Sequence, residues 1–318
     1  MTLDTNPMGE FFQRLGQRVV RTESTWWHEV QPHVFLSFPY YRLIQPAEGE
    51  IRALFREHRL RAIRYTTPLE GFGFFSTIEI NDDTSYDISR IRKTEVRRAI
   101  RHGLRNFTVQ LIDADLLFEQ GLALNKDTAD RQGRKTIYTD PDYWRRYCQA
   151  VNDTPAVTTW GAIREGQLAS YMITVQFDGW SNWLLAHSLN SMLRLRPTNA
   201  VYYVACKHLL VDPGGYKICH GLGSLEEVPE LDRFKRGMGI KLVPIKQRLA
   251  FSGAIRAAMA LAPEPVLKVA SRLFPRSYTV RKTAAMFRLY HRQSIELPPA
   301  DEQAPPEEPQ SPGEQDNE

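Results

Sequence analysis

Two histidines stand at the ends of strand-like segments, where an imidazole could take part in proton transfer. His187 lies near the end of the apolar segment 180–188, and His220 directly follows the apolar run 216–219. An imidazole titrates near neutral pH, so each histidine is a candidate general base. Glu226, a little further along, could serve the same purpose through a water molecule. Hydrogen-bonded structural histidines would leave the same pattern, and that alternative stays open.

Cationic residues follow in the segment 231–239 (LDRFKRGMG), which we expect to be a basic, glycine-containing loop. Phe234 and Lys235 stand there between Arg233 and Arg236. A mobile ammonium group is a good point charge for stabilising developing negative charge on an oxygen atom. A basic turn that is merely exposed to solvent would look the same in sequence.

The turn 191–199 (SMLRLRPTN) leads into the segment 200–210, whose apolar positions have helical spacing. Thr198 or Asn199 can cap this helix. A turn that cradles a pyrophosphate usually needs glycine, because the backbone must approach the phosphates closely, and this turn has none. Arg194 and Arg196 could bind phosphate with their side chains instead. With Arg236, these four residues are the candidates for binding a cofactor.

The elements that position these residues follow from turn and helix signals. Segment 160–189 contains three apolar runs separated by Arg-Glu-Gly at 164–166 and by Asp178-Gly179, which predicts three antiparallel strands. The helix from about 198, a strand at 216–219 and the basic loop come next. Upstream we expect helices at 9–21, 48–58, 89–102 (ended by Gly103), 115–128 and 141–152, and strands around 26–27, 34–38, 60–65 and 72–80. From 252 to 290 the pattern predicts two or three amphipathic helices.

This order, with these residues, resembles the Gcn5-related N-acetyltransferase (GNAT) fold, and within it the branch of the Fem-type peptidoglycan aminoacyl transferases. The resemblance implies an α/β (α+β) protein with a mixed, mostly antiparallel sheet flanked by helices, in a doubled GNAT architecture. Residues 1–104 would be a diverged first half and 105–250 the transferase domain. Residues 251–295 would be C-terminal helices, ahead of a disordered tail at 296–318 that is acidic and rich in proline.

The resemblance also implies a reaction, the transfer of an acyl or aminoacyl group to an amine or hydroxyl. The donor would be an acyl-CoA such as acetyl-CoA, or an aminoacyl-tRNA, and the acceptor a small molecule or a cell-envelope precursor. Phe234 and Lys235 match a pair implicated in the transfer step of Fem-type enzymes. In that branch an acidic residue often ends the second strand of the site. His220 stands in its place here, so an inherited mechanism that needs the acid is in doubt.

Charge and composition restrict the partners. The 318 residues have a net charge of +4, and setting aside the eight acidic residues of the tail leaves +12 on residues 1–295. So basic a body favours an anionic partner such as CoA, tRNA or an anionic lipid. Six arginines and lysines at 90–101 lie on a predicted helix that could hold phosphates or simply be solvated. A non-catalytic module that binds nucleic acid or anionic lipid is therefore the alternative function.

Other classes find little support in the sequence. The phosphate-loop, HExxH, GxSxG and CxxC motifs do not occur, and the eight histidines have no metal-binding spacing, so we expect no metal. Cys148, Cys206 and Cys219 stand in apolar surroundings and are expected to be reduced. No apolar run could span a bilayer. We therefore expect a cytoplasmic protein, with peripheral contact at the inner membrane face left open, and the oligomeric state is not predicted.

Overall fold

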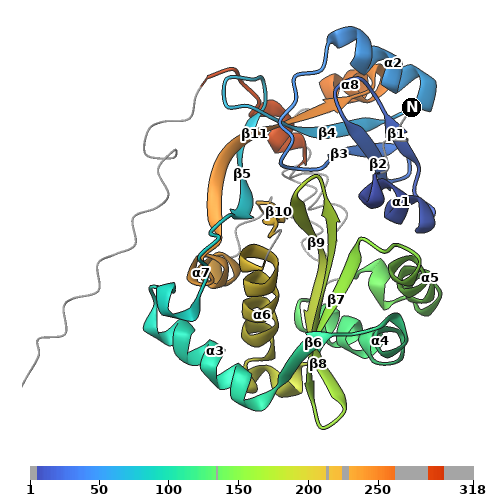
Figure 1. The fold of residues 1–318 in the computed structure, drawn as a ribbon. Coiled ribbons are helices and arrows are strands. Elements are labelled where there is room, and N and C mark those ends of the chain that lie inside the picture. The colour runs from blue at the N-terminus through green and yellow to red at the C-terminus, as the bar shows by residue number, and fades with distance from the viewer. Residues whose placement is uncertain (1–5, 134, 213–214, 224–228, 262–285, 297–318) are drawn as a thin grey trace, which may run out of the picture.

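The computed structural model describes residues 6–133, 135–212, 215–223, 229–261 and 286–296 (Figure 1). The strands of this part of the chain form one mixed sheet in the order β1-β2-β3-β4-β11-β5-β10-β9-β8-β7-β6. They are β1 Val19–Arg21, β2 Trp26–Gln31, β3 Val34–Phe38, β4 Ala62–Thr67, β5 Phe74–Asn81, β6 Thr108–Leu111, β7 Val157–Arg164, β8 Gln167–Phe177, β9 Trp180–Ser188, β10 Lys217–Leu222 and β11 Lys241–Phe251. Most neighbouring pairs are antiparallel, as expected.

Helices cover both faces of this sheet. The α-helices are α1 Pro7–Arg14, α2 Glu48–His58, α3 Thr94–Asn106, α4 Ala114–Arg131, α5 Pro141–Asn152, α6 Pro197–Val211, α7 Pro229–Gly237 and α8 Gly253–Leu261. Three short 3-10 helices join them: η1 Ile88–Arg90, η2 Ile137–Thr139 and η3 Asn190–Leu195. No helix within the described ranges is both long enough and apolar enough to cross a membrane.

The same topology occurs twice along the chain, which confirms the predicted doubled architecture. In the first half, β1, β2 and β3 are antiparallel neighbours, and α2 leads to β4, which pairs parallel to β3. In the second half, β7, β8 and β9 are antiparallel neighbours, and α6 leads to β10, which pairs parallel to β9. Each half therefore has two parallel neighbouring strands joined by a helix that crosses over the sheet.

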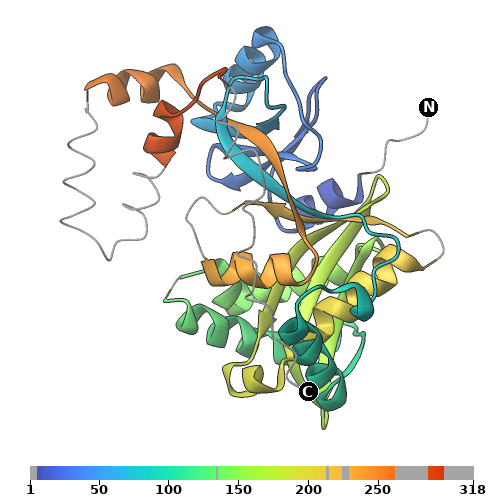
Figure 2. The ribbon, with the colours of Figure 1, turned by 90° about the vertical axis from the view of Figure 1, so that its left-hand side faces the viewer.

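The two halves exchange their last strands. β5, which follows the first half, pairs with β10 of the second, whereas β11 pairs with β4 of the first. β5 and β11 also pair with each other, so the sheet is continuous (Figures 1 and 2). The regions 1–104 and 105–250, distinguished in the sequence, thus share one sheet.

Three apolar clusters fix the helices on the sheet. One packs α3 and α6 against the second half, with Ile100 and Val201 fully buried. A second, around Trp144 and Tyr171, joins α1, α4 and α5 to the other face. A third holds α2 on the first half through residues such as Trp27. Cys148, Cys206 and Cys219 are free and buried, in agreement with the sequence analysis.

Several predicted boundaries were wrong, for local reasons. The helix expected at 9–21 ends at Arg14, because Gly16 adopts a left-handed conformation (φ +81°) and Val19 begins β1. The helix expected to end at Gly103 continues to Asn106. Gly103 instead allows a close approach of α3 to α6, since a Cβ atom there would lie 2.5 Å from the carbonyl oxygen of Arg196.

Two further predictions were wrong near the candidate site. Neither Thr198 nor Asn199 caps α6: its N-cap is Arg196, in a left-handed conformation without a side-chain cap, and Pro197 occupies the first turn. The expected loop at 231–239 is mostly the helix α7. The tail at 297–318 and the predicted helix around 265–274 lie outside the described residues.

Candidate functional site

The parallel strands β9 and β10 separate after a short paired region, and the candidate site lies where they part. Their pairing ends at Asn182 and Cys219, although both strands continue. On the other edge of β10, Cys219 pairs with Ile80 and Gly221 with Glu79, so His220 is the extra residue of a β-bulge. A bulge commonly re-aims a side chain. The space between β9 and β10 beyond their paired residues is called the strand gap below.

His220 is buried in aromatic surroundings at this gap. Its ring lies 4.2 Å from the ring of Trp183 and is stacked at 6.2 Å from that of Tyr202. Both ring nitrogens of His220 and the indole nitrogen of Trp183 are buried without a hydrogen-bond partner among the described residues. Burial, followed by the nearby charge of Lys235, lowers the pKa of His220 to about 3. The imidazole is therefore neutral at neutral pH.

Lys235 enters the same region from α7 and forms a buried ion pair. Its Nζ donates a hydrogen bond of 2.6 Å to Oε1 of Glu79 on β5, and the two side chains are only 12% and 2% exposed. The preceding residue, Phe234, packs edge-on against Tyr202, with ring centroids 5.0 Å apart. α7, α6 and β5 thus bring Phe234, Lys235, Tyr202 and Glu79 together beside His220.

Glu79 was missed by the sequence analysis, which placed it in a strand without assigning it a role. The acid that Fem-type proteins often carry at the end of the second strand is absent from β10, but the adjacent strand β5 brings a carboxylate opposite Gly221. A glutamate between isoleucines in a strand was the available signal, because a charge facing a sheet interior needs a partner. Its partner lies 156 residues away, so spacing could not identify it.

His187 does not join this cluster. Its Nδ1 lies 2.7 Å from Oδ1 of Asn125 on α4 and 3.2 Å from the hydroxyl of Tyr171, and its ring meets the edge of Tyr138. The residues that His187 contacts belong to the side of the sheet covered by α4 and α5, whereas His220 contacts Tyr202 of α6. The two histidines therefore serve different environments.

The start of α6 gathers the predicted cofactor-binding residues at the end of β9. Thr198 shares a hydroxyl hydrogen bond of 2.7 Å with Ser188, and Asn199 donates to the sulfur of Met238. Arg194 on η3 and Arg196, which directly follows it, are exposed, and their side chains have no hydrogen-bonding or ionic partner in the described part of the chain. Arg236 is half-buried on α7. Glu226 lies outside the described residues, so its predicted role has no structural counterpart here.

Solved structures with the same fold were found by comparison. FemX superimposes with a TM-score of 0.56 at 12% identity, over 80% of this chain and 93% of that one. L-PGS from Bacillus licheniformis gives a TM-score of 0.52 at 12% identity, over 84% and 92%. The C-terminal domain of a putative lysylphosphatidylglycerol synthetase from Agrobacterium fabrum gives 0.50 at 12% identity, over 80% and 89%. No protein-family model and no curated protein sequence matches the chain.

Similarity at this low identity establishes the fold alone. The predicted GNAT-like fold, in the arrangement seen in Fem-type proteins, is confirmed. The superpositions cover 80–84% of this chain, so the likeness extends over both halves and not only the transferase-like half.

Proposed function

We propose that this protein is an acyltransferase whose reaction takes place in the strand gap between β9 and β10. It moves an acyl or aminoacyl group from a CoA or tRNA donor to an amine or hydroxyl. The observation that carries the proposal is the set of three buried, unpartnered ring nitrogens of His220 and Trp183 beside the Lys235–Glu79 ion pair. Burying polar atoms without partners is costly, and such atoms are typical of places where a ligand supplies the missing hydrogen bonds.

Each group in the gap has a role that its chemistry allows. Attack by the acceptor on the acyl carbonyl carbon places negative charge on the carbonyl oxygen, and the Lys235 ammonium and the Trp183 N–H are suited to stabilise it. The bond from the acyl carbon to the donor sulfur or oxygen then breaks, and the acceptor proton leaves to the donor group or to water. Glu79 holds Lys235 in position. His220, with a pKa of about 3, orients a bound group and is too weak a base to take that proton at neutral pH.

Exposed arginines around the start of α6 favour a polyanionic donor, and we infer aminoacyl-tRNA rather than acyl-CoA. Arg98, Arg101 and Arg105 are spaced by three and four residues and so share one face of α3, which packs beside η3 with Arg194 and Arg196. These five side chains have no ionic partner among the described residues. Their arrangement suits a phosphate chain that is longer than a single pyrophosphate.

Donor turnover and donor binding test this proposal together. We would measure release of the acyl group from acetyl-CoA and from a mixture of aminoacyl-tRNAs, and the affinity of each donor at low and moderate salt. The double variant Lys235→Met/Glu79→Gln removes the ion pair without leaving an unpaired buried charge, and should lose at least 100-fold in turnover. Lys241→Met is the matched control, since Lys241 forms an exposed pair with Asp82 at the same 2.6 Å. Equal loss in both variants would contradict the assigned site.

The same measurements address the non-catalytic alternative. RNA binding that weakens steeply with salt, without turnover of either donor, would favour a module that binds nucleic acid through the arginines of α3 and η3. Turnover with acetyl-CoA at an affinity insensitive to salt would instead overturn the inference of tRNA. The acceptor that completes the reaction would be a small molecule or a cell-envelope precursor, reached in the cytoplasm or at the inner membrane face.

A further inference from the structure

A cleft lies between the two halves, apart from the arginines of α3 and η3. It has a volume of about 620 Å³ and is bounded by α1 and β2 of the first half and by η2, α5 and β9 of the second. Several aromatic side chains line it, among them Phe12, Tyr40, Tyr138, Tyr143 and Trp183. Space of this size accommodates a small organic molecule.

An arginine whose side chain has no partner among the described residues lies on the sheet face that carries His28 of the cleft wall. His28, Leu36 and Arg64 are direct partners across β2, β3 and β4, so their side chains share one face of the sheet. It is the face opposite to α2, since Ile63 and Tyr65 pack in the cluster under that helix. The Arg64 side chain is partly buried, yet it has no hydrogen bond or ion pair to another described residue. Burial lowers the pKa of its guanidinium.

The positive charge of Arg64 shifts the pKa of two residues that line the cleft. Arg64 adds to the effect of burial in lowering the pKa of His28 to about 3, and it opposes the effect of burial on Tyr40, whose pKa is raised to about 12. His28 is only 4% exposed, stacks on Phe12, and has a buried Nε2 without a partner in the described ranges. Nδ1 of His28 lies 2.8 Å from Oε1 of Gln17, which can only accept, so the imidazole proton is on Nδ1 and Nε2 is left to accept a hydrogen bond from a ligand N–H or O–H. The guanidinium of Arg64, without a counter-ion among the described residues, is the group that attracts an oxyanion.

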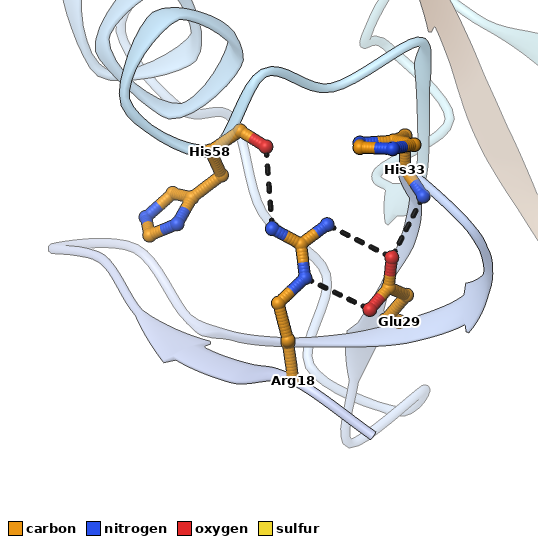
Figure 3. Close-up of polar contacts among 4 residues, drawn as sticks. All are labelled: Arg18, Glu29, His33 and His58. Carbon is orange, nitrogen blue, oxygen red and sulfur yellow. Dashed lines mark hydrogen bonds and ion pairs between the residues drawn. The ribbon is translucent and has the colours of Figure 1, made fainter. Parts of the chain in front are cut away.

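The acidic residue that lines the cleft is already paired with another arginine. Glu29 lines the cleft, but both of its carboxylate oxygens accept hydrogen bonds of 2.8 Å from Arg18, and the backbone N–H of His33 donates to one of them (Figure 3). The Arg18 side chain also donates to the carbonyl oxygen of His58, and this hydrogen bond connects the β1-β2 hairpin to the end of α2. Glu29 is therefore committed and does not serve as the counter-ion of Arg64.

Trp183 connects the cleft to the strand gap. It lines the cleft together with Leu184, while its ring also contacts those of His220 and Tyr202. We propose that the cleft binds the acceptor, an organic anion with an apolar or aromatic body whose carboxylate or phosphate pairs with Arg64. Its amine or hydroxyl then lies on the Trp183 side, where it attacks the acyl carbon as described above. This inference rests on the proposed function for the identity of the ligand as acceptor.

Binding of simple anions, measured without any donor, tests the inference separately from acyl transfer. Phenyl phosphate and benzoate are the probes for the two kinds of oxyanion, and phenol is the uncharged control, each titrated by calorimetry. We expect at least one anion to bind tenfold more tightly than phenol. Arg64→Gln should weaken that binding by tenfold or more, Arg64→Lys should restore part of it, and Arg61→Gln, an exposed arginine three residues earlier, should leave it unchanged. Equal affinity for phenol, or equal binding by Arg64→Gln, overturns the inference.

A second variant tests the cleft without altering Arg64. Ile137 lines the rim and is 56% exposed, so Ile137→Glu adds a repelling charge at little cost to folding, and Ile137→Gln is its neutral match. Anion binding should weaken at least fivefold in the first and stay within twofold of the natural protein in the second. Thermal unfolding of Arg64→Gln should occur at the same temperature as that of the natural protein or higher. A large decrease would mean that Arg64 supports the fold, and would overturn its assignment to a ligand.

Discussion

At the scale of single residues, variants of the buried ion pair between Lys235 and Glu79 can distinguish its contribution to stability from its contribution to turnover. Removing one partner of a buried pair leaves an uncompensated charge, which typically costs about 3–5 kcal/mol, whereas an exposed pair contributes about 1 kcal/mol or less. We therefore expect Lys235→Met to lower the free energy of unfolding by about 3 kcal/mol or more. Lys241→Met, which breaks the exposed pair with Asp82, should change it by less than about 1 kcal/mol.

Urea unfolding of the two variants and of Lys235→Met/Glu79→Gln gives the measurement. The double variant should regain most of the stability, because no buried charge is left without a partner. If it stays as unstable as Lys235→Met, the ion pair is not the cause of the loss. Recovery of stability without recovery of turnover would show that the pair serves the reaction.

Two buried neutral histidines make stability depend on pH in a defined window. His28 and His220 both have a pKa lowered from 6.5 to about 3, first by burial and then by Arg64 and Lys235 respectively. Below pH 6.5 these two imidazoles bind protons in the unfolded chain but stay neutral in the folded chain. The free energy of unfolding therefore decreases as the pH falls from 6.5 towards 3. Each histidine contributes about 1.4 kcal/mol per pH unit in the middle of that window.

His28→Phe tests this dependence, since a phenyl ring at this position can stack on Phe12 as the imidazole does, at 4.0 Å between ring centroids. Between pH 4.5 and 6 the slope of unfolding free energy against pH should fall by up to half. Glu29, with its pKa lowered to about 2 by the hydrogen bond from Arg18, contributes mainly below this range. His291→Gln, at an exposed position, is the control. An unchanged slope in His28→Phe would show that His28 is not held neutral.

At the scale of elements, α3 depends on one glycine for its contact with α6. A Cβ atom at Gly103 would lie 2.5 Å from the carbonyl oxygen of Arg196 and 3.0 Å from Cβ of Ala200. Gly103→Ala should therefore force the helices apart and cost about 1–3 kcal/mol. Gly49→Ala in α2 is the matched change, because nothing lies within 4 Å of its Cβ, and it should stabilise by about 0.5–1 kcal/mol. Thermal unfolding of both variants tests this prediction. Equal changes in unfolding temperature would contradict the close approach of α3 to α6.

Local signals explain which elements could be predicted from the sequence. Asp178-Gly179 and Glu165-Gly166 have the positive φ angles of tight hairpin turns, and these turns determined β7, β8 and β9 correctly. β11 has no such signal, since it contains Lys246, Gln247 and Pro244 and is fixed by distant partners. Pro244 is tolerated because β11 pairs there only with β5, and its pairing with β4 begins at Lys246.

The same distinction applies to the site. Phe234 and Lys235 were proposed from the sequence because they are adjacent and resemble a known pattern. His220 departs from that pattern and was proposed from its position at the end of a strand. The structure brings the three residues together around Tyr202. Glu79 and Arg64 were not found, because each acquires its role from strands that are distant in sequence. A lone charge in an apolar strand indicates that a protein partner or a ligand compensates it. Only the three-dimensional arrangement shows that Glu79 has a protein partner, Lys235, whereas the Arg64 side chain has none among the described residues.

At the scale of the whole molecule, the exchange of β5 and β11 makes each half depend on the other. Without residues 1–104, β10 and β11 would lose their pairing with β5, and β11 would also lose β4. Long strands left without a neighbour expose unpaired backbone groups and apolar side chains, which favours aggregation. The two halves of the fold should therefore unfold together, although the topology of each half looks complete.

Calorimetric unfolding of the full chain should accordingly show one transition, with a van't Hoff enthalpy close to the measured enthalpy. Residues 1–104 and 105–318 produced separately should show no cooperative unfolding, and co-expression should yield a complex that unfolds like the intact chain. An independently folded 105–318 fragment would contradict this, because it would need β10 and β11 to be stable without β5. Such coupling would keep the cleft and the strand gap in a fixed geometry. Any separation of the two halves would have to break the pairings among β4, β11, β5 and β10.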